Sequence, residues 1–257
     1  MYLIGIGDEK KKILKVYQKL VWEGIDVQLI DNEKELVNKL INDKNVKGAI
    51  RGTLSSSKLL PLLRNEIGQF YRASIMKNPF TNNIFLLAPV GIDEISENND
   101  KIKIINYLIN YLKSKNITPK IGLLSNGRLS DYGRSNNIDK SLKESEEIIN
   151  YFKEKYNGVL SKSKNGIVLN LDNGIKFYNE GILIEEYLKN NCNIIIASDG
   201  ITGNLIFRCL GLVCNIKGYG ALILNKNNIN FIDTSRSGDE GRYYNAVKYL
   251  VKNGDLS

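Results

Sequence analysis

The sequence predicts an α/β protein in which helices cover a parallel or mixed sheet. Three observations support this prediction. Short apolar runs alternate with amphipathic stretches along almost the whole chain, which is the order that strand–helix–strand units produce. The chain of 257 residues is long enough for one large domain or two modest ones. Its 42% hydrophobic and 25% charged residues are typical of an ordinary globular protein.

Compact apolar runs predict the strands. In KIGLLS, residues 120–125, the apolar residues follow one another as they do in a buried strand. The strands predicted in this way are residues 2–6, 27–30, 47–50, 71–76, 84–89, 120–125, 167–169, 193–197, 221–224 and 229–233.

Longer stretches with apolar residues at helical spacing predict the helices, as in KIKIINYLINYLKSK, residues 101–115. The predicted helices are residues 9–23, 33–43, 55–66, 101–114, 140–156, 181–189, 203–212 and 241–252.

Turn-forming residues indicate how the chain is divided. LSKSKNGIVLNLDNGIKF, residues 160–177, has the character of turns and short strands, with hairpin turns at its two Asn-Gly steps. MKNPFTNN, residues 76–83, and NIKGYG, residues 215–220, are the best crossing points between domains. We therefore expect a discontinuous first domain, residues 1–80 plus 218–257, and a second domain, residues 81–217.

The absence of histidine restricts the chemistry that the chain can perform. Without histidine there is no His-based acid–base catalysis, no Ser-His-Asp triad and almost no catalytic zinc site. The three cysteines, Cys192, Cys209 and Cys214, lack C-x-x-C spacing and lie in or beside apolar segments. We expect buried thiols there, with no disulfide and no metal site.

The formal net charge of +8 favours anionic partners. Much of the lysine falls on predicted helix faces, and no nucleic-acid-binding signature is present, so we expect no nucleic acid partner. No apolar run approaches the roughly 18 residues of a membrane span, and the first strand leads into charges and not into a signal peptide. We therefore expect a cytoplasmic protein without a membrane partner.

Four segments share one arrangement: a buried strand, then small polar or cationic residues, then a helix. Open α/β sheets bind ligands beyond the carboxyl ends of their strands, and helix N-termini suit phosphate. In the first segment, GAIRGTLSSSKLL, a serine before the helix is explained by capping. Arg51 is not so explained, and it is the candidate ligand.

The second segment, IGLLSNGRLSDYGRS, contains Ser125, Asn126, Arg128 and Arg134. Two arginines and an Asn-Gly step exceed what a turn needs, so this segment predicts anion recognition. The alternative is an exposed loop in which Asp131 pairs with an arginine, a contact worth less than about 1 kcal/mol.

The third segment, IIIASDGITGNLIFRCLG, places Thr202, Gly203 and Asn204 at a predicted helix start. The backbone amides of Gly203 and Asn204 would bind an anion there, and Gly203 would let the ligand approach closely. Asp199 either caps this helix or accepts a proton.

The fourth segment, INFIDTSRSGDEGR, carries Ser235, Arg236 and Asp239 before the last helix. Arg236 would clamp a phosphate with paired N–H donors, a geometry that lysine does not offer.

Taken in order, these segments resemble those of the phosphate acetyl/butyryl transferase superfamily. SDGITGNLIFRCLG is similar to an Asp-Gly-Phe-x-Gly-Asn helix start, and KIGLLSNGR to a Leu-Ser/Asn-x-Gly/Ser-Thr loop. KGYGALILNKNNINFIDTSRSG resembles a Gly-Pro-x-x-x-Gly stretch with a Leu-Ser-Arg-Gly close, and VKGAIRGTLSSSKLL an Asp-Gly-x-Val-x-Gly segment. The RGT step and the SNGRxSDxGR loop are more similar still to one branch, a methanogenesis marker protein (MtxX-type) of methanogenic archaea. Its members have been labelled as a putative methyltransferase subunit.

The resemblance implies a two-domain, mostly parallel α/β fold like that of isocitrate and isopropylmalate dehydrogenases. It also implies a homodimer with the active cleft between the domains. Phosphotransacetylases pass an acyl group between coenzyme A and phosphate, so a small anionic substrate is expected: phosphate, an acyl phosphate or a coenzyme A thioester. No cofactor is implied. Ser235 and Arg236 match the pair at the phosphoryl or acyl end, Gly203 and Asn204 match the helix-start anion site, and Ser125 matches the loop serine.

Two departures from the superfamily pattern bear on catalysis. Ser237 separates the Ser-Arg pair from Gly238, and the aspartate expected seven residues after the serine is replaced by Arg242, or by Tyr243 if the extra residue is allowed for. Asp239 is the carboxylate that remains nearby to act as a base. The sequence therefore supports a phosphate acyltransferase-like enzyme. The alternatives are a non-catalytic anion-binding or regulatory protein and a methyltransferase subunit that binds a methyl-carrier protein.

Overall fold

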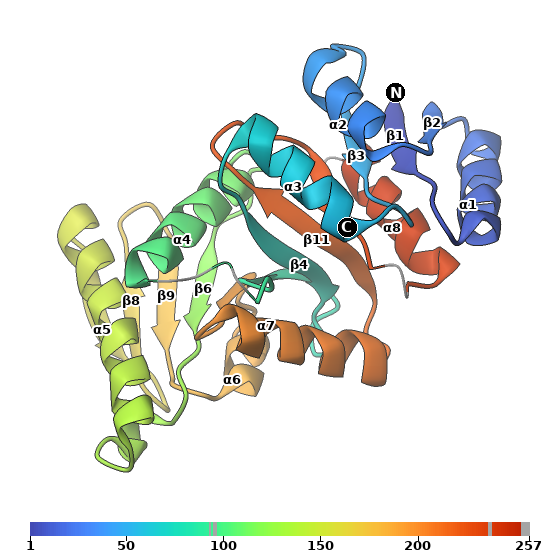
Figure 1. Ribbon diagram of the computed structural model, residues 1–257. Helices are drawn as coiled ribbons and strands as arrows, with labels where there is room; N and C mark the ends of the chain where they lie inside the picture. The colour runs from blue at the N-terminus through green and yellow to red at the C-terminus, as the bar shows by residue number, and fades with distance from the viewer. Residues whose placement is uncertain (93, 95–96, 236–237, 253–257) are drawn as a thin grey trace. The chain divides into compact units, whose positions relative to one another are not determined.

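The computed structural model of the chain describes residues 1–92, 94, 97–235 and 238–252. The chain forms two compact α/β units, and the predicted fold class is confirmed (Figure 1). Unit 1 contains Met1–Ile75 together with the stretch that begins at Lys217, and unit 2 contains Met76–Ile216. Unit 1 is therefore built from two stretches that are far apart in the sequence.

The sheet of unit 1 is parallel over most of its width. Its strand order is β2 (Val27–Ile30), β1 (Tyr2–Gly5), β3 (Gly48–Ile50), β12 (Phe231–Asp233), β11 (Gly218–Leu224) and β4 (Tyr71–Lys77), of which unit 1 contains β4 as far as Ile75. The first four strands in this order pair in parallel, and β11 runs antiparallel to β12. The loops that follow β1, β3 and β12 consequently leave the sheet at one edge.

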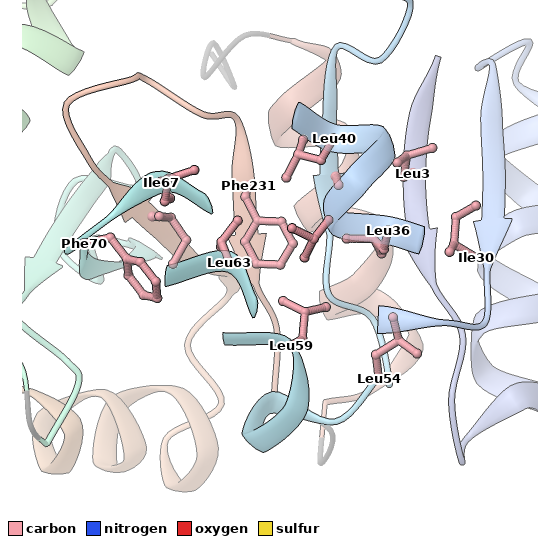
Figure 2. Close-up of a cluster of buried hydrophobic side chains, with 13 residues drawn as sticks. Leu3, Ile30, Leu36, Leu40, Leu54, Leu59, Leu63, Ile67, Phe70 and Phe231 are labelled. Atoms are coloured by element: carbon pink, nitrogen blue, oxygen red, sulfur yellow. The ribbon is translucent and has the colours of Figure 1, made fainter. Parts of the chain in front are cut away.

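Two pairs of helices cover this sheet. Helices α2 (Glu33–Asn42) and α3 (Ser56–Ile67) pack on one face, where they bury a shared apolar cluster with the sheet (Figure 2). Helix α8 (Glu240–Val251) contacts β3, and α1 (Lys10–Trp22) packs on α8. The residues of the apolar cluster include Leu3, Ala49 and Phe231 from the strands and Leu36, Leu40, Leu59 and Leu63 from the helices.

The sheet of unit 2 combines a parallel part with a meander. Its strand order is β5 (Ile84–Ala88), β10 (Ile194–Ile196), β6 (Lys120–Leu123), β9 (Lys176–Asn179), β8 (Ile167–Asn170) and β7 (Val159–Lys162). The first four strands pair in parallel, whereas β8 pairs antiparallel with both β9 and β7. The meander confirms the short strands and Asn-Gly turns predicted between residues 160 and 177.

Helices lie on both faces of the unit 2 sheet. Phe152 of α5 (Asn136–Tyr156) packs on Phe177 of β9, with ring centroids 4.6 Å apart. Tyr187 of α6 (Ile184–Lys189) lies over the backbone of Gly122, where a Cβ atom would be 2.7 Å from the ring. Because Ile121 is in register with Phe177, and successive residues of a strand alternate between faces, α5 and α6 cover opposite faces. The remaining helices are α4 (Asn98–Lys113) and α7 (Gly200–Phe207), which continues as a π-helix, Arg208–Val213.

Four predicted helix starts are wrong by three or four residues. The helices predicted from residues 101 and 140 begin at Asn98 and Asn136. The helix predicted from residue 181 begins at Ile184, because Gly181 adopts a left-handed conformation with φ of 69°. The helix predicted from residue 203 begins at Gly200. Among the residues that the structure describes, no helix is both long and apolar enough to cross a membrane.

A buried ion-pair network joins the two stretches of unit 1. The Arg51 guanidinium donates through Nε to Asp233 Oδ1, through Nη2 to the Thr234 carbonyl, and through Nη1 to the Leu54 carbonyl at 2.8 Å. Arg72 Nη1 lies 3.2 Å from the second oxygen of Asp233. Arg51 and Asp233 are 5% and 9% exposed, so each charge depends on the other for its stabilisation.

We predict that Asp233→Ala lowers the free energy of unfolding by about 3–5 kcal/mol, because it leaves Arg51 buried without its carboxylate. Urea denaturation measures this loss. Lys15→Ala is the control: it removes an exposed ion pair with Glu240, and such a pair contributes less than about 1 kcal/mol. Equal effects of the two substitutions would contradict the prediction.

Candidate functional site

The candidate site lies at the carboxyl edge of the parallel strands of unit 2. Strands β5, β10, β6 and β9 are neighbours and run in the same direction, so the loops that follow them gather at one edge of the sheet. Ligands of open α/β sheets bind at such an edge. The loops are residues 89–91, 197–199, 124–127 and 180–183.

The turn into α7 is held by its own side chains. Asp199 Oδ1 accepts a hydrogen bond from the Thr202 amide at 2.7 Å, which confirms the predicted capping role of Asp199. Ser198 Oγ lies 3.2 Å from Thr202 Oγ1 and 3.4 Å from Asp199 Oδ2. The Asp199 carboxylate already supplies negative charge to the positive end of the helix dipole. An anion bound here would therefore depend mainly on the hydroxyl groups and on the amides of Gly200 and Ile201.

The sequence predicted that Gly203 and Asn204 form the first turn of α7. The structure contradicts this prediction. The Gly203 amide donates to the Asp199 carbonyl at 3.0 Å and is part of the helix ladder. A Cβ atom on Gly203 would be 1.9 Å from the Pro89 carbonyl oxygen, so the glycine lets the 89–91 loop, and not a ligand, approach closely. The Asn204 side chain donates to the Val90 carbonyl at 2.9 Å. Both residues thus fasten α7 to the loop after β5.

The loop after β6 combines buried serines with exposed arginines. Ser125 is buried, and its hydroxyl lies 2.7 Å from that of Ser145 on α5. The Asn126 amide donates to Ser141 Oγ, also on α5, at 3.0 Å. These two hydrogen bonds to serines of α5 therefore fix the beginning of the loop on that helix.

Further along this loop the arginines reach the surface. Asp131 accepts from the Arg128 amide at 2.8 Å and pairs with Arg134 Nη1 at 2.9 Å. The Arg134 side chain is 73% exposed, and such a pair contributes less than about 1 kcal/mol. The pairing is the alternative considered for this loop, and its weakness lets Arg134 exchange Asp131 for an anionic ligand at little cost.

Sequence reasoning missed Tyr187, which connects the loops after β6 and β9. Its hydroxyl accepts from the Glu180 amide at 2.7 Å, and lies 2.7 Å from the Leu123 carbonyl and 3.0 Å from the Gly181 carbonyl. Burial raises the pKa of the Tyr187 phenol, which keeps it protonated as a donor to one of these carbonyls. No short motif marks such a residue, because it lies on a helix outside the loops that it joins.

Sequence reasoning also missed two polar side chains at the end of β9. Asn179 is 0% and Glu180 is 2% exposed. Both amide atoms of Asn179 and Oε2 of Glu180 have no hydrogen-bond partner in the described part of the chain. The sequence signal was present in FYNEGI, where polar residues end an apolar strand before a glycine. Buried polar atoms without partners are rare and destabilising, so they mark this strand end as unusual.

Of the predicted residues of unit 1, Arg51 and Ser235 follow the carboxyl ends of β3 and β12. The hydrogen bonds of Arg51 to Asp233, Thr234 and Leu54 give it a structural role, and its predicted role as a ligand stays a prediction. The Ser235 carbonyl accepts from the Tyr243 hydroxyl at 2.9 Å.

Asp239 is the N-cap of α8. Its Oδ1 accepts from the Arg242 amide at 2.8 Å, an engagement that competes with its predicted role as a base. Arg236 lies outside the described residues.

The cysteines are free thiols, but the prediction that all three are buried is wrong. Cys192 is buried, and burial raises the pKa of its thiol. Cys209 and Cys214 are exposed, because the apolar π-helix and the residue after it leave one side uncovered. In the part of the chain that the structure describes, no group of three or more His, Cys, Asp or Glu residues could hold a metal ion.

Relatives of the chain occur in methanogens. A protein of Methanocaldococcus jannaschii named as an uncharacterized methyltransferase is 55% identical over 256 residues, which cover 98% of this chain and 97% of the relative. The putative methyltransferase mtx subunit X of Methanosarcina barkeri is 33% identical over 250 residues, 95% of this chain and 80% of the relative. The chain belongs to the family of these methanogen proteins. No family model matches it.

Solved structures show that this family has the phosphotransacetylase fold. A branched-chain phosphotransacylase from Enterococcus faecalis superposes with a TM-score of 0.72 at 14% identity, over 99% of this chain and all of the other. A phosphotransacetylase from Streptococcus pyogenes gives a TM-score of 0.64 at 13% identity, over 98% and 94%. The resemblance to the methanogen branch of the superfamily and the two-domain α/β fold are therefore confirmed.

We predict that Glu180→Gln raises the free energy of unfolding by about 1 kcal/mol, because it removes a negative charge that is buried without a full set of partners. Urea denaturation near neutral pH measures the gain. The matched control is Glu185→Gln, an exposed side chain at the start of α6, which should change stability little. A loss of stability in Glu180→Gln would mean that the carboxylate has a structural partner.

Proposed function

We propose that the chain is a phosphate acyltransferase-like protein of methanogen metabolism. It binds phosphate or an acyl phosphate and uses coenzyme A or its thioester as the second substrate. The fold of two phosphotransacylases supports this proposal, as do the polar residues at the carboxyl edge of unit 2. The predicted location of the complete site, between the two domains, is part of the proposal.

The observation that carries the proposal is the matched placement of two hydroxyl groups. Leu123 of β6 is in register with Ile196 of β10, and the Leu124 amide donates to the Ile196 carbonyl at 2.9 Å. Ser125 and Ser198 each follow two residues after this pair. One phosphoryl group beyond these strand ends would lie beside both loops, with Thr202 on α7 beside Ser198. Ser125 would donate to it by giving up its hydrogen bond with Ser145.

Positioning would supply most of the catalysis in this reaction. The thiol sulfur of coenzyme A attacks the carbonyl carbon of the acyl phosphate, a C–S bond forms, and the bond from carbon to the phosphate oxygen breaks. The thiol proton passes to a base or to the released phosphate. Arginines and hydroxyl groups would stabilise the developing oxyanion. Arg128 and Arg134 are exposed beside the Ser125 loop, and Ser235 and Arg236 are proposed to act at the phosphoryl or acyl end.

We predict that the chain forms a thioester from coenzyme A and one member of a panel of acyl phosphates, and that Arg236→Ala slows this reaction at least about 100-fold, the effect of losing one oxyanion donor. Thioester absorbance and phosphate release measure the rate. Arg64→Ala, an exposed arginine of α3, is the control. Undiminished turnover by Arg236→Ala would overturn the assignment of that residue.

Two alternative functions make different predictions in the same experiment. A non-catalytic anion-binding or regulatory protein would be stabilised by phosphate or coenzyme A, through preferential binding to the folded state, without turnover. The relatives' names favour a methyltransferase subunit. Such a subunit would bind a methyl-carrier protein and have no affinity for acyl phosphates.

We also propose that the chain forms a homodimer through α7 and the π-helix that follows it. Ile201, Leu205 and Val213 are 65%, 61% and 80% exposed, and Cys209 is exposed as well. These four residues, the α7 stripe, recur every four positions, so they share one side of the helix. Arg208 is the one charged residue in residues 200–213. An uncharged apolar stripe is complementary to a second copy of itself, as a two-fold interface requires.

We predict that Leu205→Glu converts the dimer into a monomer, because it places two like charges in the interface. Sedimentation velocity measures the mass. Val159→Glu is the matched control, since Val159 on β7 is 65% exposed, close to the 61% of Leu205, but lies outside the α7 stripe. A monomeric wild-type chain, or an unchanged dimer in Leu205→Glu, would contradict the proposal.

A further inference from the structure

The outer face of α1 carries the only tryptophan of the chain in an exposed position. Trp22 is 87% exposed, and Leu14 and Val21 beside it on the helix are 43% and 48% exposed. Large aromatic side chains bury much apolar area when they are covered, and Trp is among the commonest anchors of protein interfaces. An indole left in water at the end of a well-formed helix is therefore a feature that folding alone does not explain.

The exposed residues share one side of α1. Leu14, Gln18, Val21 and Trp22 are separated by three or four positions, and Lys11 and Lys15 continue the same side toward the helix N-terminus. We call this the α1 face. The opposite side of the helix, Ile13, Val16 and Leu20, is buried in unit 1. Helix α1, whose place in unit 1 is labelled in Figure 1, is thus fixed by one face, and the residues of the other face are exposed to solvent.

The charge on α1 has one sign. The helix contains Lys10, Lys11, Lys12, Lys15 and Lys19 and no acidic residue. Lys15 and Lys12 pair with Glu240 and Glu9, and Lys19 lies over the Tyr244 ring. The Lys15–Glu240 pair is solvent-exposed, with side chains 68% and 44% exposed, so it contributes little and can be exchanged.

The acid that follows Trp22 is held away from the α1 face. Glu23 accepts from the Tyr244 hydroxyl at 2.8 Å and from Lys248 Nζ at 2.9 Å, both on α8. These hydrogen bonds lower the pKa of Glu23. The α1 face therefore combines an apolar anchor at one end with Lys11 and Lys15 at the other, where Lys15 has, among the described residues, only its solvent-exposed pair with Glu240.

We propose that the α1 face docks on an acidic protein, with Trp22 seated in an apolar pocket and Lys11 and Lys15 beside Asp or Glu side chains at its rim. Charge complementarity selects this occupant, since the net charge of the chain is +8 and α1 has no acid to offer a basic partner. A helix that presents apolar anchors two turns apart, here Leu14 with Val21 and Trp22, fits a groove on a protein.

Two other anionic occupants fit the α1 face less well. A helix that binds a membrane surface buries a continuous apolar face in the lipid, but the continuous apolar face of α1 is already buried in unit 1. Nucleic acid would engage the lysines through its phosphates, and would leave Leu14 and Val21 without a partner. A protein groove uses both halves of the α1 face.

Trp22 provides the test, because the emission of the chain reports on this one indole. The full chain is titrated with a synthetic helical peptide that has Glu on one side and Leu on the other. We expect a blue shift on binding, and an affinity that falls about tenfold or more from low to high salt, as screened charge contacts require. Binding of Trp22→Ser is followed by anisotropy of the labelled peptide and should be at least about tenfold weaker, as for loss of an interface anchor.

A pair of variants with equal net charge separates the α1 face from the overall charge. Lys11→Glu with Lys15→Glu should abolish the blue shift, whereas Lys34→Glu with Lys44→Glu, exposed lysines elsewhere in unit 1, should preserve it. No blue shift with the peptide, or equal loss in both double variants, overturns the proposal. Tighter binding to phosphatidylglycerol vesicles or to duplex DNA than to the peptide also overturns it, in favour of that class of partner.

Discussion

The buried contact between Arg51 and Asp233 is the interaction on which unit 1 depends. Arg51 follows β3 near the beginning of the chain, and Asp233 ends β12 near its end, so their pairing joins two stretches that the whole of unit 2 separates. The register of β3 with β12, Ile50 opposite Ile232, brings the two side chains together. Arg72 engages the second carboxylate oxygen from β4. One carboxylate thus fixes three strands of the sheet, and the direction in which the loop after β12 leaves it.

That same contact explains why a plausible sequence hypothesis about Arg51 was incomplete. An arginine and a glycine after a buried strand are what a phosphate site needs, and also what a buried clamp on a distant carboxylate needs. Asp233 lies 182 positions away, and nothing local marks it as the partner. Tertiary pairing over such a separation is not encoded in a motif, so the structural role of Arg51 could be seen only in the folded chain.

Elements with a strong local signal were predictable, and those that depend on neighbours were not. Apolar runs and helical spacing identified the alternating strands and helices, and Asn-Gly steps identified the meander. The start of α7 was misplaced because Gly203 and Asn204 look like a ligand-binding turn, whereas the space at Gly203 is taken by the Pro89 carbonyl. Glu180 was missed because its role, too, depends on the residues around it in the fold. Its interest comes from burial without a partner for one oxygen, which no residue pattern shows.

The acidic side chains at the carboxyl ends of the parallel strands differ in their hydrogen bonds and ion pairs. Asp199 caps α7, Asp239 caps α8 and Asp233 is held by arginines, so three aspartates near predicted anion sites have structural duties. A carboxylate engaged in this way repels a phosphate less than an unengaged one, because its charge is shared with amides or guanidinium groups. The Glu180 carboxylate is the contrast, since the side chain is buried and its Oε2 accepts no hydrogen bond from any described residue. The edge of unit 2 therefore combines hydroxyl groups with one buried carboxylate whose Oε2 has no hydrogen-bond partner in the described part of the chain.

The α7 stripe and the α1 face are both exposed apolar surfaces, and their charges suit them to different partners. The α7 stripe has four residues without charge, so two copies can meet face to face without repulsion. The α1 face carries lysines at one end, and two copies in antiparallel contact would bring the lysines of each against the apolar anchor of the other, which desolvates charge without compensation. In the proposed dimer, self-association would therefore use the α7 stripe, and the α1 face would remain for the proposed partner, which contributes the acidic groups that α1 lacks.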